Sequence, residues 1–158
     1  MKHTNESEIP CVERRSPGGR FHLFRRHISQ ALGAPADAPP ANGGHPFDVE
    51  LTKLPPGATN FPFHFHAAQW EFYLIRSGSG ELRTSDGMVP IKTGDAFICP
   101  PGDAHQIKNT GSEDLVYYVI ADNQSADVGY YPDTGKWFIK PQRKCFTLQE
   151  ADYYAGEE

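Results

Sequence analysis

The chain has 158 residues, which predicts one domain, since domains usually run to about 100–150 residues. Its net charge of −5 argues against a duplex-binding protein, because nucleic-acid-binding domains usually carry a basic excess. The longest apolar run, Leu115 to Ala121, is far shorter than the roughly 20 residues of a membrane span, so neither nucleic acid nor a membrane is expected as a partner.

The cysteines indicate the redox compartment. Cys11, Cys99 and Cys145 are widely spaced and form no CxxC pair. This usage favours free thiols in a reducing environment over a disulfide framework. The first ten residues also lack the apolar stretch of a secretory signal. Both observations predict a cytoplasmic protein.

Three parts follow one another along the chain. Residues 1–46 are polar and then rich in Pro, Ala and Gly, which predicts an N-terminal arm and linker. Within them, the spaced apolar residues of 20–32 suit a short helix or an arm packed on the domain. Residues 47–122 predict a β-barrel, and residues 123–158 predict a C-terminal extension that packs on the barrel or on a partner subunit.

The middle part has the pattern of an all-β domain. About seven short stretches of strand-forming residues are separated by turn residues at intervals of roughly 8–12 residues, which is typical of a sandwich or barrel. The clearest stretches are 47–54, 71–76, 81–84, 88–91, 95–99, 104–109 and 115–121.

His64 and His66 are the first candidate metal ligands. Alternate residues of a strand point to the same face, so both imidazoles should project to one side. Phe61, Phe63 and Phe65 should then project to the other side. An aromatic row of this length must be covered, and we expect the N-terminal arm or a second subunit to cover it.

Glu71 and His105 can complete such a site. Glu71 follows His66 closely, and His105 comes 39 residues after His66, directly after a Pro-Pro-Gly turn. Two strands of a closed sheet can bring His105 opposite the histidine pair. Three imidazoles and one carboxylate suit one divalent transition metal (Fe, Mn, Ni, Cu or Zn) and leave coordination positions open for water or substrate.

These residues lie in two motifs that resemble those of the cupin superfamily. The resemblance implies a double-stranded β-helix and implies His64, His66, Glu71 and His105 as the metal ligands. Many cupins have an acidic residue just before the ligand glutamate, where this chain has Trp70. The motifs read Gly57-x6-His64-x-His66-x4-Glu71-x6-Gly78 and Gly94-x5-Pro100-x-Gly102-x2-His105-x3-Asn109.

The flanks carry a narrower resemblance. The segment YPDTGKW at 131–137 and the ending DYYAGEE are similar to those of uncharacterised single-domain bacterial cupins, a group sometimes labelled sugar phosphate isomerase-like. The broader resemblance to the cupin superfamily rests mainly on residues 57–109, where both motifs lie.

Tyr73 is the candidate catalytic residue, since it shares a strand face with Glu71 and should point into the barrel. Its reference pKa near 10 makes it a poor general base. Gln106 is out of phase with His105 and should point outward. The basic stretch 25–27 is expected to be a solvated arm, with a clamp for an anionic ligand as the alternative. Core positions are expected at Phe47, Phe97 and Ile107, with Cys99 as a small apolar filler.

Three functions remain open at this point. The first is a small metalloenzyme acting on a small polar or anionic metabolite, either as a sugar-phosphate-type isomerase or as an Fe-dependent dioxygenase. The second is a non-catalytic cupin that binds or senses a small molecule. The third is a structural, metal-free cupin. A homodimer is expected in each case.

Overall fold

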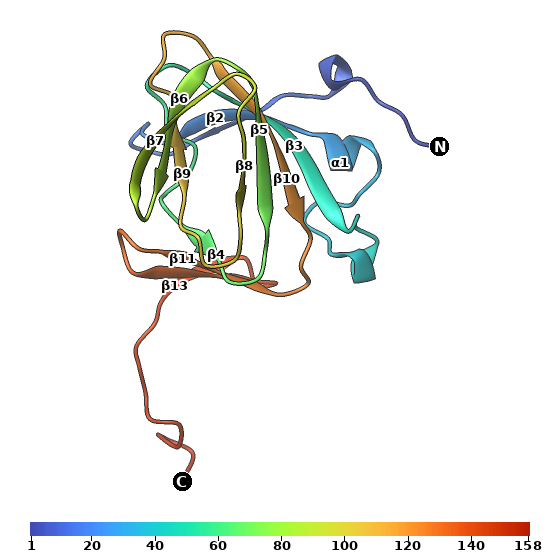
Figure 1. Cartoon of the computed structure of the whole chain (residues 1–158). Helices are drawn as coiled ribbons and strands as arrows, with labels where there is room; N and C mark the ends of the chain where they lie inside the picture. Colours follow the sequence, from blue (N-terminus) through green and yellow to red (C-terminus); the bar gives the residue numbers. More distant parts are fainter.

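The computed structural model describes residues 1–158, of which 46% lie in strands and 6% in helices. The largest sheet has six antiparallel strands in the order β1-β2-β3-β10-β5-β8 (Figure 1). Their bounds are β1 Val12–Arg15, β2 His22–His27, β3 Phe47–Leu54, β10 Leu115–Asp122, β5 Glu71–Ser77 and β8 Ala96–Cys99.

Two smaller sheets complete the barrel. A three-stranded sheet faces the large sheet, and a four-stranded sheet lies across one end of the barrel (Figure 1). The first contains β7 Gly87–Lys92, β6 Ser79–Thr84 and β9 Gln106–Lys108, and the second contains β13 Lys144–Thr147, β12 Lys136–Lys140, β11 Asp127–Tyr131 and β4 Phe65–His66.

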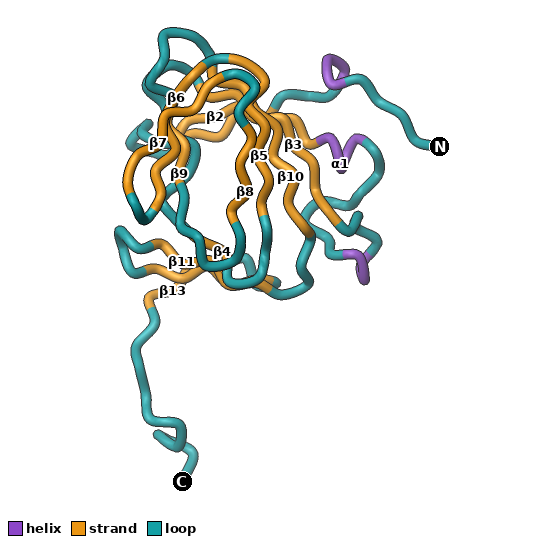
Figure 2. Tube along the Cα trace, viewed as in Figure 1, coloured by secondary structure: helices purple, strands orange, loops and turns teal.

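Helical structure is confined to three short segments before β3 (Figure 2). They are η1 Glu6–Glu8, α1 Ile28–Ala31 and η2 Pro40–Asn42. None of them has the length and apolar character that crossing a membrane would require. The predicted all-β fold and double-stranded β-helix are confirmed.

The core lies between the six-stranded and three-stranded sheets. Alternate residues of β10 are buried, from Leu115 to Ala121, as expected for a strand with one face toward the core. The three-stranded sheet contributes Leu82, Ile91 and Ile107 from the opposite side. The whole cluster comprises Leu23, Leu54, Tyr73, Ile75, Leu82, Ile91, Cys99, Ile107, Leu115, Tyr117 and Val119.

Of the two alternatives expected for residues 20–32, the short helix is wrong for most of its length, and an arm packed on the domain agrees with the structure. Residues 22–27 form β2, which pairs antiparallel with β3, and only Ile28–Ala31 are helical. The free edge of β3 offers these residues a ladder of backbone hydrogen bonds, and tertiary pairing of this kind overrides a weak local helix preference. The N-terminal arm is therefore part of the largest sheet.

Some core expectations held and two did not. Ile107 is fully buried, Cys99 lies in the core, and Phe97 packs against it. Phe47, however, is 50% exposed, because it is the first residue of β3 and lies at the end of the ladder. Gln106 was expected to point outward but is buried. Its side-chain amide donates a 2.6 Å hydrogen bond to the backbone carbonyl of a loop residue, Phe61.

The three phenylalanines do not form one row, because a regular strand begins only at Phe65. Phe61 lines the same cavity as His64. Phe63 is buried, with the Arg83 guanidinium 3.9 Å from its ring centre, and Phe65 contacts Tyr130 of β11. The C-terminal extension therefore covers Phe65, and neither the N-terminal arm nor a second subunit is needed there.

Candidate metal centre

Backbone pairing brings the two motif segments together. His64 and His105 form an isolated antiparallel bridge, in which the His105 amide donates to the His64 carbonyl at 2.8 Å. Their ring centres are 4.8 Å apart, and those of His64 and His66 are 5.2 Å apart. Glu71, the first residue of β5, reaches the same point. One ligand atom each of His64, His66 and Glu71 lies within 4.8 Å of the others.

His105 borders this cluster through Glu71. The His105 Nε2 atom is 2.8 Å from Glu71 Oε2. Neighbouring ligands of one six-coordinate ion, with bonds of about 2.1 Å, are about 3.0 Å apart, so this pair already has the spacing of two adjacent ligands. The donor set of three imidazoles and one carboxylate therefore fits a divalent transition metal.

Each imidazole is oriented by a hydrogen bond at Nδ1. His64 Nδ1 donates to the Pro62 carbonyl at 2.9 Å, and His105 Nδ1 donates to the Asp103 carbonyl at 3.0 Å. His66 Nδ1 donates to Asp127 Oδ2 at 2.5 Å. We assign the tautomers from these acceptors, which leave Nε2 of all three rings directed at the centre. Metal-bound histidines are oriented by hydrogen bonds of this kind.

Asp127 was missed by sequence reasoning. It is the first residue of β11, and the register of β11 against β4 places it beside His66. Its Oδ1 accepts a 2.9 Å hydrogen bond from the Ala68 amide. Burial opposes ionisation, but the hydrogen bond to His66 and its charge outweigh burial and lower the Asp127 pKa to about 2. No motif marks this aspartate, because it is 61 residues from its partner.

The electrostatics of the centre favour one anionic carboxylate among imidazoles. Burial, with the neighbouring His105, lowers the pKa of His64 to about 4, so this ring is neutral near pH 7. Burial would raise the Glu71 pKa, but the His105 hydrogen bond and the nearby imidazoles hold it well below its usual range. Burial would lower the pKa of His105, but its contacts with Cys99 and Glu71 raise it to about 10. His64 and Glu71 are therefore in the forms that bind metal, whereas His105 has to release a proton.

Tyr73 lies where the alternation of β5 predicts, beside Glu71. Its hydroxyl donates to Glu71 Oε2 at 2.9 Å and is 3.2 Å from His105 Nε2. Its ring stacks on Phe97 with centres 4.9 Å apart. Burial and the Glu71 charge raise the pKa of Tyr73 well above 10. The hydroxyl is therefore a hydrogen-bond donor at neutral pH, and a role for it as general base is not supported.

A cavity of about 320 Å³ opens onto the cluster. Arg25 of β2 lies in its wall, with Nη1 2.7 Å from Glu50 Oε2 and the guanidinium 5.0 Å from the Phe61 ring centre. Its Nε is buried and has no hydrogen-bond partner. The expected solvated arm is therefore wrong for Arg25, because pairing of β2 with β3 brings this side chain to the cavity.

Asp48 is a second residue of the cavity that the sequence did not mark. It is half-buried on β3, and its carboxylate takes part in none of the side-chain hydrogen bonds or ion pairs of the structure. Burial raises its pKa, and the charge of Glu50 raises it further. Such a group can exchange a proton with a ligand in the cavity.

Residues 50–121 match the cupin domain family. Together with the double-stranded β-helix and the His-His-Glu cluster, this match identifies residues 50–121 as a cupin domain.

Three similar proteins illustrate the relationship. The oxalate-binding protein of Thermotoga maritima is 38% identical over 68 residues, which are 43% of this chain and 55% of the relative. The chain spans about half the length of the curated relatives it matches. A solved protein of Acidithiobacillus ferrooxidans has a TM-score of 0.77 at 22% identity over 92% of both chains. A sugar phosphate isomerase of the cupin superfamily from Silicibacter pomeroyi has a TM-score of 0.75 at 22% identity, over 91% of this chain and 90% of that one. At this identity, the two structures show the shared fold alone.

Proposed function

We propose that this cupin holds one divalent transition metal through His64, His66, Glu71 and His105 and acts on a small anionic metabolite. The observation that carries the proposal is the cluster of His64, His66 and Glu71, with His105 2.8 Å from Glu71, beside a cavity that also contains the half-buried Arg25. When bound, a divalent metal supplies Lewis-acid polarisation of a substrate oxygen.

Arg25 supports the anionic character of the ligand. Its position is fixed by Glu50 and by the Phe61 ring, and its Nε remains free to donate. A guanidinium offers a planar fork of donors that matches carboxylate and phosphate groups. The names of two similar proteins, an oxalate-binding protein and a sugar phosphate isomerase, refer to ligands of this charge.

Within the enzyme class, we favour proton-transfer isomerisation of a sugar-phosphate-type substrate over an Fe-dependent dioxygenase. Isomerisation needs a general base outside the metal ligands, and Asp48 offers an unpaired carboxylate in the cavity whose pKa burial raises. Tyr73 then acts as a donor that positions Glu71. A dioxygenase would not require Asp48, which separates the two reactions.

The alternative is a non-catalytic cupin that binds or senses a small anion. The name of the Thermotoga maritima relative refers to binding, and the same cavity with Arg25 serves this role equally well. A binder would not depend on the Asp48 carboxylate. Asp48→Asn therefore separates an enzyme from a binding protein as well.

The first experiment is elemental analysis of untagged protein purified without added metal, beside a His66→Ala, His105→Ala double variant. We expect near-stoichiometric metal in the natural protein and its loss in the variant. Metal below about a tenth of an equivalent in both would refute the metal site. Metal-loaded protein is then incubated with sugar phosphates in D2O and, separately, in an oxygen electrode. Deuterium incorporation that Asp48→Asn abolishes supports the isomerase, whereas oxygen uptake supports the dioxygenase.

We also propose that the chain forms a homodimer through the outer face of the large sheet. Phe72 of β5 is the register partner of both Ile98 and Ile120. Ile98 is 56% exposed, and Ile120 and the neighbouring Leu74 are exposed as well. An apolar row across three strands of one exposed face is a typical association surface.

A further inference from the structure

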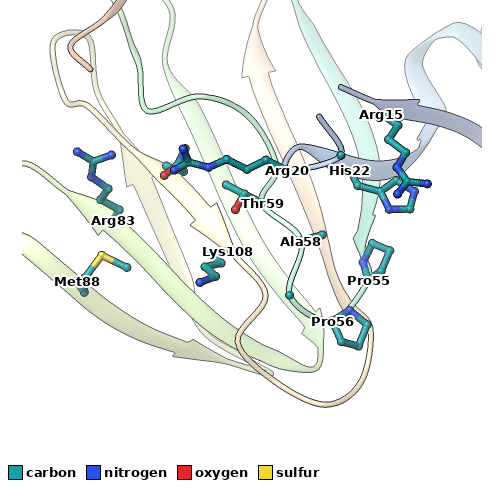
Figure 3. Close-up of a pocket in the computed structure, with 13 residues that line it drawn as sticks. Arg15, Arg20, His22, Pro55, Pro56, Ala58, Thr59, Arg83, Met88 and Lys108 are labelled. Atoms are coloured by element: carbon teal, nitrogen blue, oxygen red, sulfur yellow. The ribbon is translucent and has the colours of Figure 1, made fainter. Parts of the chain in front are cut away.

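A second cavity lies away from the metal centre. Its volume is about 480 Å³, and it shares no lining residue with the metal cavity. Figure 3 shows Arg20, Thr59 and Lys108 at its centre, with Arg83 to one side and Arg15 and His22 to the other. Four segments that are distant in sequence build it: the β1–β2 hairpin, the loop after β3, the β6–β7 hairpin and β9.

The lining is basic and contains no carboxylate. Arg15, Arg20, Arg83 and Lys108 are permanently charged, and His22 is a fifth basic residue. The chain as a whole has a net charge of −5, so the charge of this cavity is opposite in sign to that of the whole chain. A concave surface lined by one sign of charge concentrates ligands of the opposite sign.

Three of these cations form no ion pair, although Arg20 is near enough to Asp133 that its charge helps to lower the pKa of that carboxyl. Arg83 is held by Asp133 through two hydrogen bonds of 2.7 and 2.8 Å. His22 pairs with Glu13 at 2.8 Å. None of the ion pairs of the structure involves Arg15, Arg20 or Lys108. Mutual repulsion of such charges is relieved when an anion binds between them.

The lysine has one acidic neighbour along the sheet. Glu81 of β6 is the register partner of Lys108, but Glu81 neither lines the cavity nor pairs with the lysine. Lys108 is therefore available to a ligand.

The backbone that carries Arg20 is held in place, and two of the arginines contact neighbouring residues. The Arg20 guanidinium lies 5.4 Å from the ring centre of its neighbour Phe21, and Arg15 packs against Gly19. The Arg20 carbonyl accepts a hydrogen bond from the Thr59 amide, and the Thr59 carbonyl accepts one from the His22 amide. These bonds tie the β1–β2 hairpin to the cavity floor. A site organised in advance loses less entropy on binding.

We propose that this basic cavity is a second ligand site, which takes a small phosphate-bearing anion with at least two negative charges. Arginine forks and a lysine ammonium together are the usual donors for phosphate groups. The volume is within the range of small-molecule sites, about 300–1,000 Å³. No Phe, Tyr or Trp side chain lines the cavity, so the recognition rests on its charged and polar groups.

The proposal is tested by calorimetric titration of the full chain with inorganic pyrophosphate and with inorganic phosphate at low salt. We expect pyrophosphate to bind in this cavity more tightly than phosphate, and this binding to weaken between about 20 mM and about 150 mM NaCl because exposed charges are screened. In Arg20→Ala, Lys108→Ala the affinity should fall at least about tenfold, since two charge-assisted contacts are lost.

The matched control is Lys92→Ala, Lys144→Ala, which removes the same charge from exposed positions outside the cavity. It should bind pyrophosphate like the natural chain. Arg25→Ala and His66→Ala alter the metal cavity, so they can remove only pyrophosphate bound there. The binding that Arg20→Ala, Lys108→Ala removes should be unchanged in them, which makes this test independent of the metal site. Lys108→Gln serves as a milder variant if the double variant melts early.

Equal affinity in the cavity and control double variants would overturn the proposal. Binding that is lost in Arg25→Ala instead would assign the anion to the metal cavity and would overturn it too. The absence of any pyrophosphate binding at low salt would have the same consequence.

Discussion

Replacing Asp127 by asparagine tests whether a residue far from both motifs prepares the metal centre. Asp127 accepts the Nδ1 proton of His66 at 2.5 Å and is itself fixed by the Ala68 amide. Asparagine keeps the size of the side chain and can still accept from Ala68, but it removes the negative charge opposite His66. The His66 ring then loses part of its basicity and its fixed orientation.

The expected effect is a 10- to 100-fold weaker metal affinity, which is the usual cost of losing a partner that orients a metal-bound histidine. That range corresponds to about 1.4 to 2.7 kcal/mol at about 1.4 kcal/mol per tenfold change. The assay is competition between the protein and a chromophoric chelator for Zn²⁺ at pH 7, with the melting temperature of the metal-free protein measured in parallel.

Asp133→Asn is the matched control, because Asp133 is also an ion-paired aspartate of the C-terminal extension but pairs with Arg83 away from the cluster. Its zinc affinity should equal that of the natural chain. If Asp127→Asn melts like the natural chain and binds zinc within about twofold of it, the inference that Asp127 orients a ligand is wrong.

Four further changes test the fold, the cavity and the dimer. In urea unfolding, Gly78→Ala should lower the free energy of unfolding by about 1–3 kcal/mol more than Gly94→Ala. Both glycines have positive φ, but only at position 78 would a Cβ meet a backbone oxygen, at 2.5 Å. Equal losses in the two variants would refute this reading. Asn109→Ala should cost about 2–4 kcal/mol in the same assay, since the buried amide donates to two backbone carbonyls and accepts from a backbone amide; a change below about 0.5 kcal/mol would contradict it. Tyr73→Phe should lower the free energy of unfolding by only about 1 kcal/mol and leave zinc bound, because the stacked ring is kept and one hydrogen bond is lost. Complete loss of zinc would contradict this and make the tyrosine indispensable to the site. Ile98→Glu should yield a monomer in light scattering coupled to gel filtration, and a dimer that persists would exclude the proposed face.

The sequence by itself determined the architecture of the barrel and the chemistry of its centre. Alternation of apolar residues marked β3, β5 and β10, because the two-residue period of a strand is a local property of the chain. The same period placed Tyr73 beside Glu71. The alternation of His64 and His66, together with the resemblance of the two motifs to those of cupins, singled out the four candidate ligands. The inferences from alternation need only neighbours in sequence.

The tertiary structure decided which residues surround that centre. Asp127 reaches His66, and Arg25 reaches the cavity, through ladders between strands that are distant in the chain, and no periodicity reports which edges pair. The basic cavity likewise gathers side chains such as Arg20 and Lys108 from separate segments. Strand pairing depends on which edges remain free once the core has formed, so only the folded chain defines these sites.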